Sequence, residues 1–146
     1  MSQALTYRLG AEGVDWWVAH HIPGCARGFG PCYTLGVFSE TLVAGVVFHN
    51  HNPESGVMEM SAAAIDPKWM SRRVIYTAHD FIFNQMACQM AVLRVSEENE
   101  RMRRIGRALG YREYRIPRLR GRKEAEILMT LADDDWRNSK WGKKHG

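Results

Sequence analysis

The chain has 146 residues, of which 45% are hydrophobic and 25% charged, and its formal net charge is +4. These proportions are typical of one ordinary globular domain, which at this length can bury a core without disulfides or a structural metal. No apolar run reaches the ~18 residues of a membrane-spanning helix, and the first residues lack the basic and apolar regions of a signal peptide. Three cysteines without metal-ligand spacing favour a reducing compartment, so we expect a cytoplasmic protein without a zinc site.

The first half of the chain is predicted to form a short helix between strands, followed by a β-hairpin and a third strand. Asp15 is a candidate N-cap for the helix, which ends before Pro23 and Gly24, and glycines mark residues 25–31 as a loop. The predicted segments are a strand at 6–9, a helix at 15–21, strands at 33–38, 42–49 and 57–65, and a turn at 50–56.

The second half of the chain alternates helices with strands. Val74, Ala78 and Ile82 recur at helical spacing and form one apolar stripe. The following arginine-rich helix can be N-capped by Ser96, and it ends at Gly110, which suits a left-handed C′ position. The predicted segments are a helix at 71–86, a strand at 91–95, a helix ending at 110, strands at 111–116 and 125–131, and a polar, partly disordered tail at 133–146.

A strand–helix–strand step in this order implies one parallel pair inside a mostly antiparallel sheet. We therefore expect an α+β fold, in which a mixed sheet of about six or seven strands is flanked by helices in a three-layer α/β arrangement. One domain is expected over residues 1–132, followed by the polar tail at 133–146.

Two blocks of residues resemble the GNAT superfamily of acyltransferases. The first is Ile65-Asp66-Pro67 followed by a loop and a helix, and the second combines Asn99-Glu100-Arg101 with Arg107-Ala108-Leu109-Gly110-Tyr111. The resemblance covers about residues 33–131 and implies an acyltransferase that uses acetyl-CoA or another acyl-CoA, with a homodimer possible. The chain departs from the family at residues 70–75, which lack the usual loop glycines, and at Gly106, where relatives often carry a tyrosine that acts as general acid.

The loop that leads into the predicted helix at 71–86 is a candidate phosphate site. The free N–H groups and partial positive charge of a helix N-terminus attract anions, and Arg72 and Arg73 would add two guanidinium groups. The three alanines at 62–64 leave room for a thin pantetheine arm, which in the family lies along this strand. The alternative is that the alanines pack in the core and the arginines are solvated. The predicted cofactor-binding residues are Ala63, Ala64, Ile65, Met70, Ser71, Arg72, Arg73, Val74 and Asn99.

Glu59 is the candidate catalytic base, because it lies on the strand before this loop and a carboxylate can take a proton from an attacking amine. The alternative is a solvent-facing strand residue. A backbone N–H near Ala63 or Ala64 is the candidate oxyanion donor. Asn99 and Ser96 are candidates for holding the cofactor arm, with helix capping as the alternative for both.

Three further features have a functional and a structural interpretation. His49 and His51 could bind a metal ion, but no third ligand is evident and a polar turn is favoured. Trp16 and Trp17 could line an acceptor pocket or pack in the core. A basic stretch between the last two strands could bind a phosphate-rich partner, although a solvated loop is favoured; it contains Arg112, Arg115, Arg118, Arg120, Arg122 and Lys123.

The sequence therefore predicts an acyl-CoA-dependent N-acyltransferase that transfers its acyl group to a small-molecule or peptide amine by direct attack. A GNAT variant that acts on nucleic acid and a non-catalytic CoA-binding module are the two alternatives.

Overall fold

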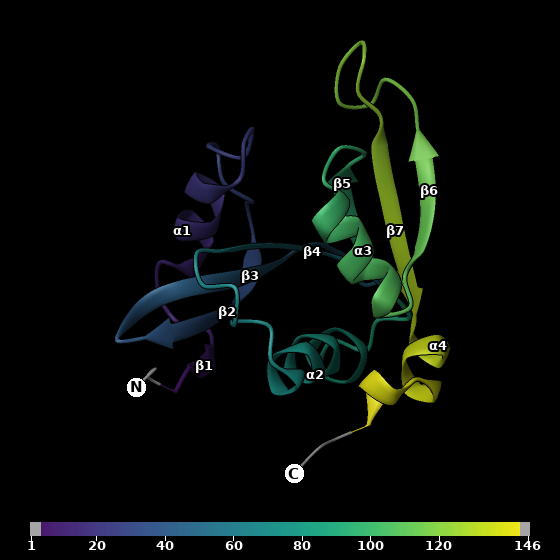
Figure 1. Ribbon diagram of the computed structural model, residues 1–146. Helices are drawn as coiled ribbons and strands as arrows, with labels where there is room; N and C mark the ends of the chain where they lie inside the picture. The colour runs from purple at the N-terminus through teal and green to yellow at the C-terminus, as the bar shows by residue number, and fades with distance from the viewer. Residues whose placement is uncertain (1–3, 144–146) are drawn as a thin grey trace.

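The computed structural model describes residues 4–143, and in them a seven-stranded sheet carries helices on both faces (Figure 1). The strand order is β1-β2-β3-β4-β5-β7-β6, and of these neighbours only β4 and β5 run parallel. The predicted α+β class and the parallel pair are confirmed. The elements are β1 (Thr6–Leu9), α1 (Val14–His21), β2 (Cys32–Ser39), β3 (Thr41–Asn52), β4 (Val57–Ala64), α2 (Arg72–Asp80), η1 (Phe81–Gln85), β5 (Met90–Ser96), α3 (Glu100–Ala108), β6 (Arg112–Ile116), β7 (Glu126–Ala132), α4 (Asp133–Asn138) and η2 (Lys140–Gly142).

Helix α1 lies directly on one face of β2 and β3 because two glycines leave room for it. A Cβ atom at Gly45 would lie 2.6 Å from Val18 and 2.7 Å from Val14, and one at Gly36 would lie 3.1 Å from Val14. Both valines are fully buried. The close approach sets how near α1 lies to the sheet, and the loop at 22–31 follows directly from its end.

Helices α2 and α3 cover the opposite face, where the main core lies. Phe48, Met58 and Met129 are fully buried there. Helix α3 passes close to β7 at Gly106, where a Cβ atom would overlap the end of the Met129 side chain. Because α1 covers only β2–β4, no helix of the described chain lies on that face of β5, β7 and β6.

Residues 133–142, which we expected to belong to a partly disordered tail, form α4 and η2 and pack onto the body of the molecule. Trp136 is 1% exposed within the main core, and Trp141 packs against the same cluster. Two apolar indoles in a polar segment are the physical reason. Residues 144–146 of the expected tail lie outside the described residues. None of the helices that the structure describes is long and apolar enough to cross a bilayer.

The capping predictions need correction. Gly13 is the N-cap of α1 without a side-chain hydrogen bond, and Asp15 lies in the first turn instead. Asn99, not Ser96, caps α3, because its side chain accepts a hydrogen bond from the N–H of Met102 at 3.2 Å.

Two predicted boundaries also differ. Strand β3 runs through most of the predicted turn to Asn52, with a bulge between His49 and Asn52. The predicted helix at 71–86 is α2 followed by the π-helical turn η1.

Candidate active site

The parallel strands β4 and β5 pair at three positions and then separate. Val57–Glu59 lie opposite Met90–Val92, and beyond this point the two strands share no pairing, although both are described to their ends. β4 continues alongside β3, and β5 continues alongside β7. The two facing edges therefore keep backbone N–H and C=O groups without a strand partner. A cavity of about 960 Å³ lies in the gap, at the upper end of the ~300–1,000 Å³ usual for a ligand site.

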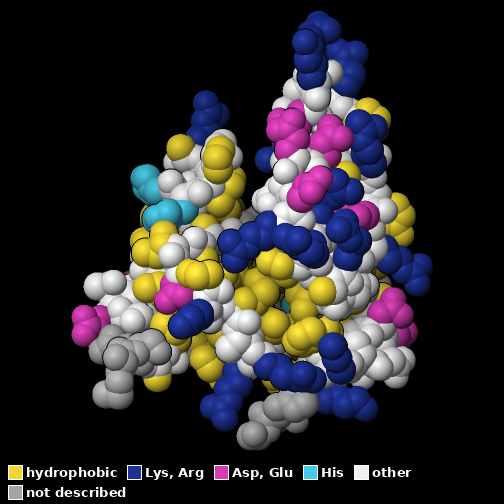
Figure 2. Space-filling view, in the orientation of Figure 1, with side chains coloured by type: hydrophobic (Ala, Val, Ile, Leu, Met, Phe, Trp, Pro, Cys, Tyr) yellow, Lys and Arg dark blue, Asp and Glu magenta, His cyan; other side chains and the backbone are white. Residues whose placement is uncertain are grey.

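One end of this cavity is apolar and lies between α2 and α3. Figure 2 shows the hollow there, with hydrophobic side chains on its floor and lysines and arginines around its rim. Ala62–Ala64 line the β4 side, and their short side chains keep the strand edge open to a ligand. The remaining apolar lining at this end comes from Trp69, Met70, Val74, Ile75, Ala78, Leu93, Val95, Met102 and Leu109.

The predicted cofactor residues divide into two groups. Those that line the cavity are Ala63, Ala64, Met70, Val74 and Asn99; those that do not are Ile65, Ser71, Arg72 and Arg73. Ile65 is 63% exposed to solvent. Ser71 is the N-cap of α2, and its hydroxyl accepts a hydrogen bond from the N–H of Val74 at 3.2 Å.

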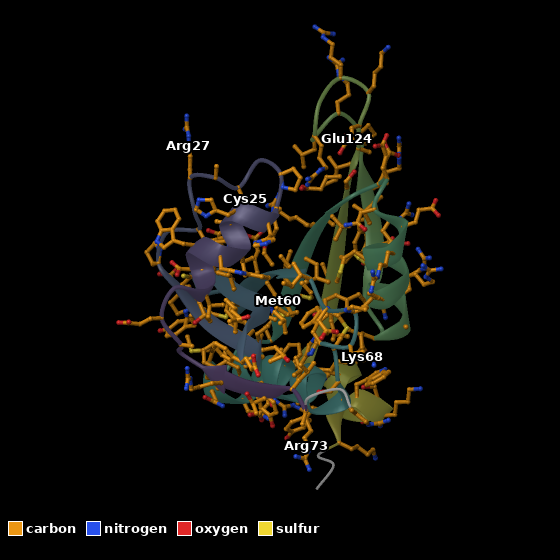
Figure 3. The ribbon with its side chains drawn as sticks, turned by 60° about the vertical axis from the view of Figure 1, so that its left-hand side comes forward. Cys25, Arg27, Met60, Lys68, Arg73 and Glu124 are labelled. Carbon is orange, nitrogen blue, oxygen red and sulfur yellow. The ribbon has the colours of Figure 1, made fainter. Side chains whose placement is uncertain are left out.

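The two arginines at the start of α2 point away from the gap. The Arg72 guanidinium donates a hydrogen bond to the carbonyl of Lys140 at 2.9 Å and lies 5.1 Å from the Trp141 ring centroid. Arg73 extends from the lower side of the molecule, away from Met60 and the cavity (Figure 3). The start of α2 nevertheless lies beside the cavity, which Met70 and Val74 line, and Ser71 caps only one of its first-turn N–H groups.

A buried histidine–tyrosine pair stands at the apolar end. His79 lines the cavity, and its Nδ1 lies 2.8 Å from the carbonyl of Ile75, so Nδ1 carries the proton. Nε2 then accepts a hydrogen bond from the Tyr111 hydroxyl at 2.7 Å. Burial lowers the pKa of His79 and raises the pKa of Tyr111, so both groups are held neutral. At Gly106 the side chain of Met129 occupies the space that a larger residue would need.

Glu59 lies where the strands separate and is 7% exposed. One carboxylate oxygen accepts a hydrogen bond from the Arg94 side chain, and the other accepts one from the Asn50 amide. His49 Nδ1 lies 3.7 Å from the second oxygen, and its Nε2 lies 2.9 Å from the Ser61 hydroxyl. Glu59 is thus a buried member of a side-chain network that lines the cavity, not the solvent-facing residue of the alternative interpretation.

The bulge in β3 is the local cause of this arrangement. Residues on neighbouring strand positions normally point to opposite faces, yet His49 and Asn50 both reach Glu59. The register shift between His49 and Asn52, with φ of 50° at Asn50, turns the Asn50 side chain toward β4. Burial lowers the pKa of His49, although the nearby Glu59 charge acts in the opposite direction.

The network continues across β5 and β7. Arg94 also donates to Glu126 at 2.9 Å, and Arg120 donates to Glu126 at 3.2 Å. The hydrogen bond that Arg94 donates to Glu59 is the main cause that raises the pKa of Arg94. Ser96 donates to Glu124 at 2.7 Å. All five side chains line the cavity, so its second end is charged where its first end is apolar.

This charged end opens between two projecting segments. The first, here called the loop arm, is residues 22–31 after α1, and the second, the hairpin arm, is residues 117–125 between β6 and β7. Cys25 and Phe29 of the loop arm and Glu124 of the hairpin arm line the cavity, and Figure 3 shows the two arms facing each other across its mouth.

The remaining sequence candidates are the two tryptophans and the possible metal ligands. Neither tryptophan of α1 lines the cavity: Trp17 packs beside the α1 core, and Trp16 is 52% exposed against Gly28. Within residues 4–143 no group of three potential ligands is placed to hold a metal ion. His49 contacts Ser61 and Glu59 instead.

Sequence reasoning missed Arg94, Glu126 and the role of His49 and Asn50. A usable signal existed for two of them. Arg94 interrupts the apolar run at 91–95, and Glu126 interrupts the one at 125–131. A charged residue inside a buried strand needs a partner, and here the two are partners of each other.

Comparison with known proteins finds matches among solved structures only. No family model matches the chain, and no curated protein matches it in sequence. Among solved structures, a mutant spermidine N-acetyltransferase from Vibrio cholerae superposes with a TM-score of 0.72 at 16% identity, covering 92% of this chain and 96% of the other. The ribosomal-protein-S5-alanine acetyltransferase from Vibrio fischeri gives 0.61 at 17% identity, covering 72% and 63%. A probable acetyltransferase gives 0.61 at 14% identity, covering 70% and 63%.

The chain spans less than two thirds of the length of the last two structures and nearly the whole length of the first. Together with the separated β4 and β5 strands, these likenesses show that the chain has the fold of the GNAT acetyltransferases.

Proposed function

We propose that this protein is an acyl-CoA-dependent N-acyltransferase, most simply an acetyltransferase, in which an amine attacks the acyl thioester directly. The observation that carries the proposal is the gap between β4 and β5: two strand edges without partners border a cavity of about 960 Å³. The GNAT fold of the chain supports the same activity.

The residues at the gap fit the pantetheine arm of a coenzyme A. An amide-containing chain can pair with the free backbone groups of β4, and Ala62–Ala64 leave space beside them. The apolar lining between α2 and α3 suits the methylene groups of the arm. The N-terminus of α2 offers N–H groups to a diphosphate, whereas the Arg72 and Arg73 side chains would have to turn to reach it.

Acetyl-CoA would supply an activated acyl group at this gap. The N–H of Ile65 donates a hydrogen bond to the carbonyl of Val43 of β3, and in an antiparallel ladder every second residue does so, which leaves the N–H of Ala64 on the free edge of β4. This backbone N–H of Ala64 would stabilise the oxyanion that forms during attack.

We propose that Ser61 and His49 carry away the proton of the amine, because Nε2 of His49 contacts the Ser61 hydroxyl at the cavity wall. The lowered pKa of His49 keeps its imidazole neutral and able to accept a proton. Glu59, the predicted base, then acts beside it, with its carboxylate 3.7 Å away to stabilise the imidazolium.

In the proposed reaction an N–C bond forms as the C–S bond breaks. The amine loses one proton to His49 or to solvent, and the coenzyme A thiolate gains one. Direct attack of this kind needs the amine and the thioester held together, so most of the catalysis would come from positioning.

Two measurements test the proposal. A saturating concentration of acetyl-CoA should raise the melting temperature, because a ligand that binds only the folded state stabilises it by about 2.7 kcal/mol at 100 times its Kd. Release of the free thiol should then depend on an added amine. The absence of any thermal shift would overturn the proposal. A shift without thiol release across a broad panel of small-molecule, peptide and nucleic-acid amines would identify a non-catalytic CoA-binding module instead.

A further inference from the structure

We infer that the acceptor amine is carried by a nucleic acid, whose phosphates are bound by the two arms at the charged end of the cavity. The inference concerns the acceptor side of the proposed acyltransferase and rests on that function for its chemical meaning. It starts from basic side chains that the catalytic network leaves unpaired.

The tips of both arms are basic. Arg27 lies at the tip of the loop arm, and Arg118, Arg122 and Lys123 lie on the hairpin arm. All four are exposed, and none forms an ion pair with any residue from 4 to 143. Figure 2 shows lysines and arginines at both tips, with the acidic side chains of the hairpin side lying below its tip.

The glutamates near the mouth are mostly engaged by other arginines. Glu124 and Glu126 pair with Arg120, and Glu126 and Glu59 pair with Arg94. Three carboxylates and two guanidinium groups leave the floor of the mouth with one net negative charge, while its rim carries four positive charges that form no ion pair within residues 4–143. The mouth as a whole is therefore positive and would attract an anionic ligand that spans both arms.

Flat apolar side chains accompany these charges. Trp16 is 52% exposed and lies against Gly28 of the loop arm, beside the tip that carries Arg27. Tyr114 is 51% exposed on β6, and both Tyr114 and Arg94 are register partners of Leu128, so they share the sheet face that no helix covers. Aromatic rings next to arginines form stacking platforms for bases.

This combination favours a nucleic acid over an acidic protein. Both partners would satisfy the charge, but only a nucleic acid supplies both phosphates for the planar guanidinium groups and bases for the exposed rings. The cavity of about 960 Å³ runs from the arms to the gap between β4 and β5, so a nucleotide that leaves its stack would have a path along which to present an amine there.

Binding is tested on the full chain without acyl-CoA, with fluorescently labelled short duplex DNA, single-stranded DNA and single-stranded RNA as probes. If each of the four rim side chains neutralises one phosphate, the slope of log K against log salt should be about −3 to −4 for duplex DNA. The triple variant Arg118→Glu, Arg122→Glu and Lys123→Glu should lower affinity at least about tenfold and reduce the size of the slope by about three. Arg27→Glu, on the opposite arm, should reduce it by about one.

The matched control is Arg8→Glu, Lys68→Glu and Lys143→Glu, which makes the same change in net charge with exposed residues far from the arms. It should bind the nucleic acid nearly as tightly as the wild type. Thermal unfolding of each variant checks that the fold is intact.

Three results would overturn the inference: no binding to any of the nucleic acids at low salt, equal weakening in the arm and control variants, or equally tight binding of polyglutamate, which would assign the arms to an acidic protein. The acetyl-CoA thermal shift is measured separately on the same preparations. If acetyl-CoA gives no thermal shift, the proposed function is wrong. If the shift is present but no nucleic acid binds, only the inferred identity of the acceptor is wrong.

Discussion

The two ends of the cavity offer a ligand different kinds of polar group. At the apolar end, between α2 and α3, the polar groups available to a ligand are mostly backbone groups along the β4 edge and the α2 N-terminus. At the charged end, the polar groups available to a ligand are side chains. These side chains are hydrogen-bonded to one another in a network that includes His49, Arg94 and Arg120. Backbone groups are present whatever the side chain, whereas a side-chain network requires particular residues at particular positions. The apolar end can therefore tolerate more change of sequence than the charged end.

The prediction with the largest expected effect tests the charged end of the cavity at Glu59. Glu59→Gln keeps the shape of the side chain and removes its charge, so the imidazolium at His49 loses its neighbouring carboxylate. We expect turnover to fall by about 10²–10⁴-fold, with the affinity for acetyl-CoA nearly unchanged. Thiol-release kinetics and calorimetry measure the two quantities.

Glu113→Gln is the control, because Glu113 is also paired with arginines, at 2.7 and 2.9 Å, but does not line the cavity. It should leave turnover close to the wild-type rate. Equal turnover in Glu59→Gln and the wild type would remove Glu59 from the proton path.

The next prediction tests cofactor binding at the apolar end of the cavity, which Ala64 lines. Ala64→Phe should fill the free edge of β4 and block the cofactor arm. The stabilisation by acetyl-CoA, about 2.7 kcal/mol at 100 times the Kd, should be lost, and thermal shift measures it. Ile65→Phe changes the neighbouring residue, which does not line the cavity and is 63% exposed. If both variants keep the acetyl-CoA shift, the arm does not lie along β4.

The sequence predicted the apolar end better than the charged end, for a physical reason. The strand–loop–helix order from Ala62 to Val74 is local, so the free edge and the α2 N-terminus follow from neighbouring residues. The contact between Glu59 and Arg94 joins residues 35 positions apart and depends on the register of β4 against β5. Sequence patterns indicated that these strands are parallel neighbours, but no pattern sets which residues lie opposite each other.

The sequence did not predict the bulge that turns Asn50 toward Glu59, and the reason is a different one. A cluster of asparagine, proline and glycine at 50–56 is typical of a turn, and the structure does turn at Pro53–Gly56. The strand continues to Asn52 because it pairs with Val57 beyond the bulge. Likewise the Arg72 contact with Trp141 depends on the folded C-terminal segment, which composition alone described as a polar tail.

A pH test examines the buried pair of His79 and Tyr111 at the apolar end. Burial holds the pKa of His79 below the value of about 6.5 of an unfolded chain. As the pH falls below about 6.5, the unfolded state binds a proton that the folded state does not, so stability is lost toward acid. The free energy of unfolding should fall by up to about 1.4 kcal/mol per pH unit from this group.

The double variant His79→Phe and Tyr111→Phe removes both partners and leaves neither polar group unpaired. Urea unfolding between about pH 5 and pH 7 should show a shallower pH dependence than in the wild type. A residual slope of the same sign is expected from His49, whose pKa burial also lowers. An identical slope in the two proteins would show that His79 is protonated in the fold.

The smallest expected effect concerns Arg72, whose side chain does not line the cavity. Its hydrogen bond to the Lys140 carbonyl and its position over Trp141 hold it toward the C-terminal segment. Arg72→Glu should still weaken binding of coenzyme A, by about tenfold or less, because it places a negative charge beside a helix N-terminus proposed to receive a diphosphate. Isothermal calorimetry at low salt measures it, and Arg73→Glu, which reverses a charge that points away from the cavity (Figure 3), should have a smaller effect. If Arg72→Glu leaves the affinity unchanged, the diphosphate lies elsewhere, and the apolar end binds its ligand through the β4 edge alone.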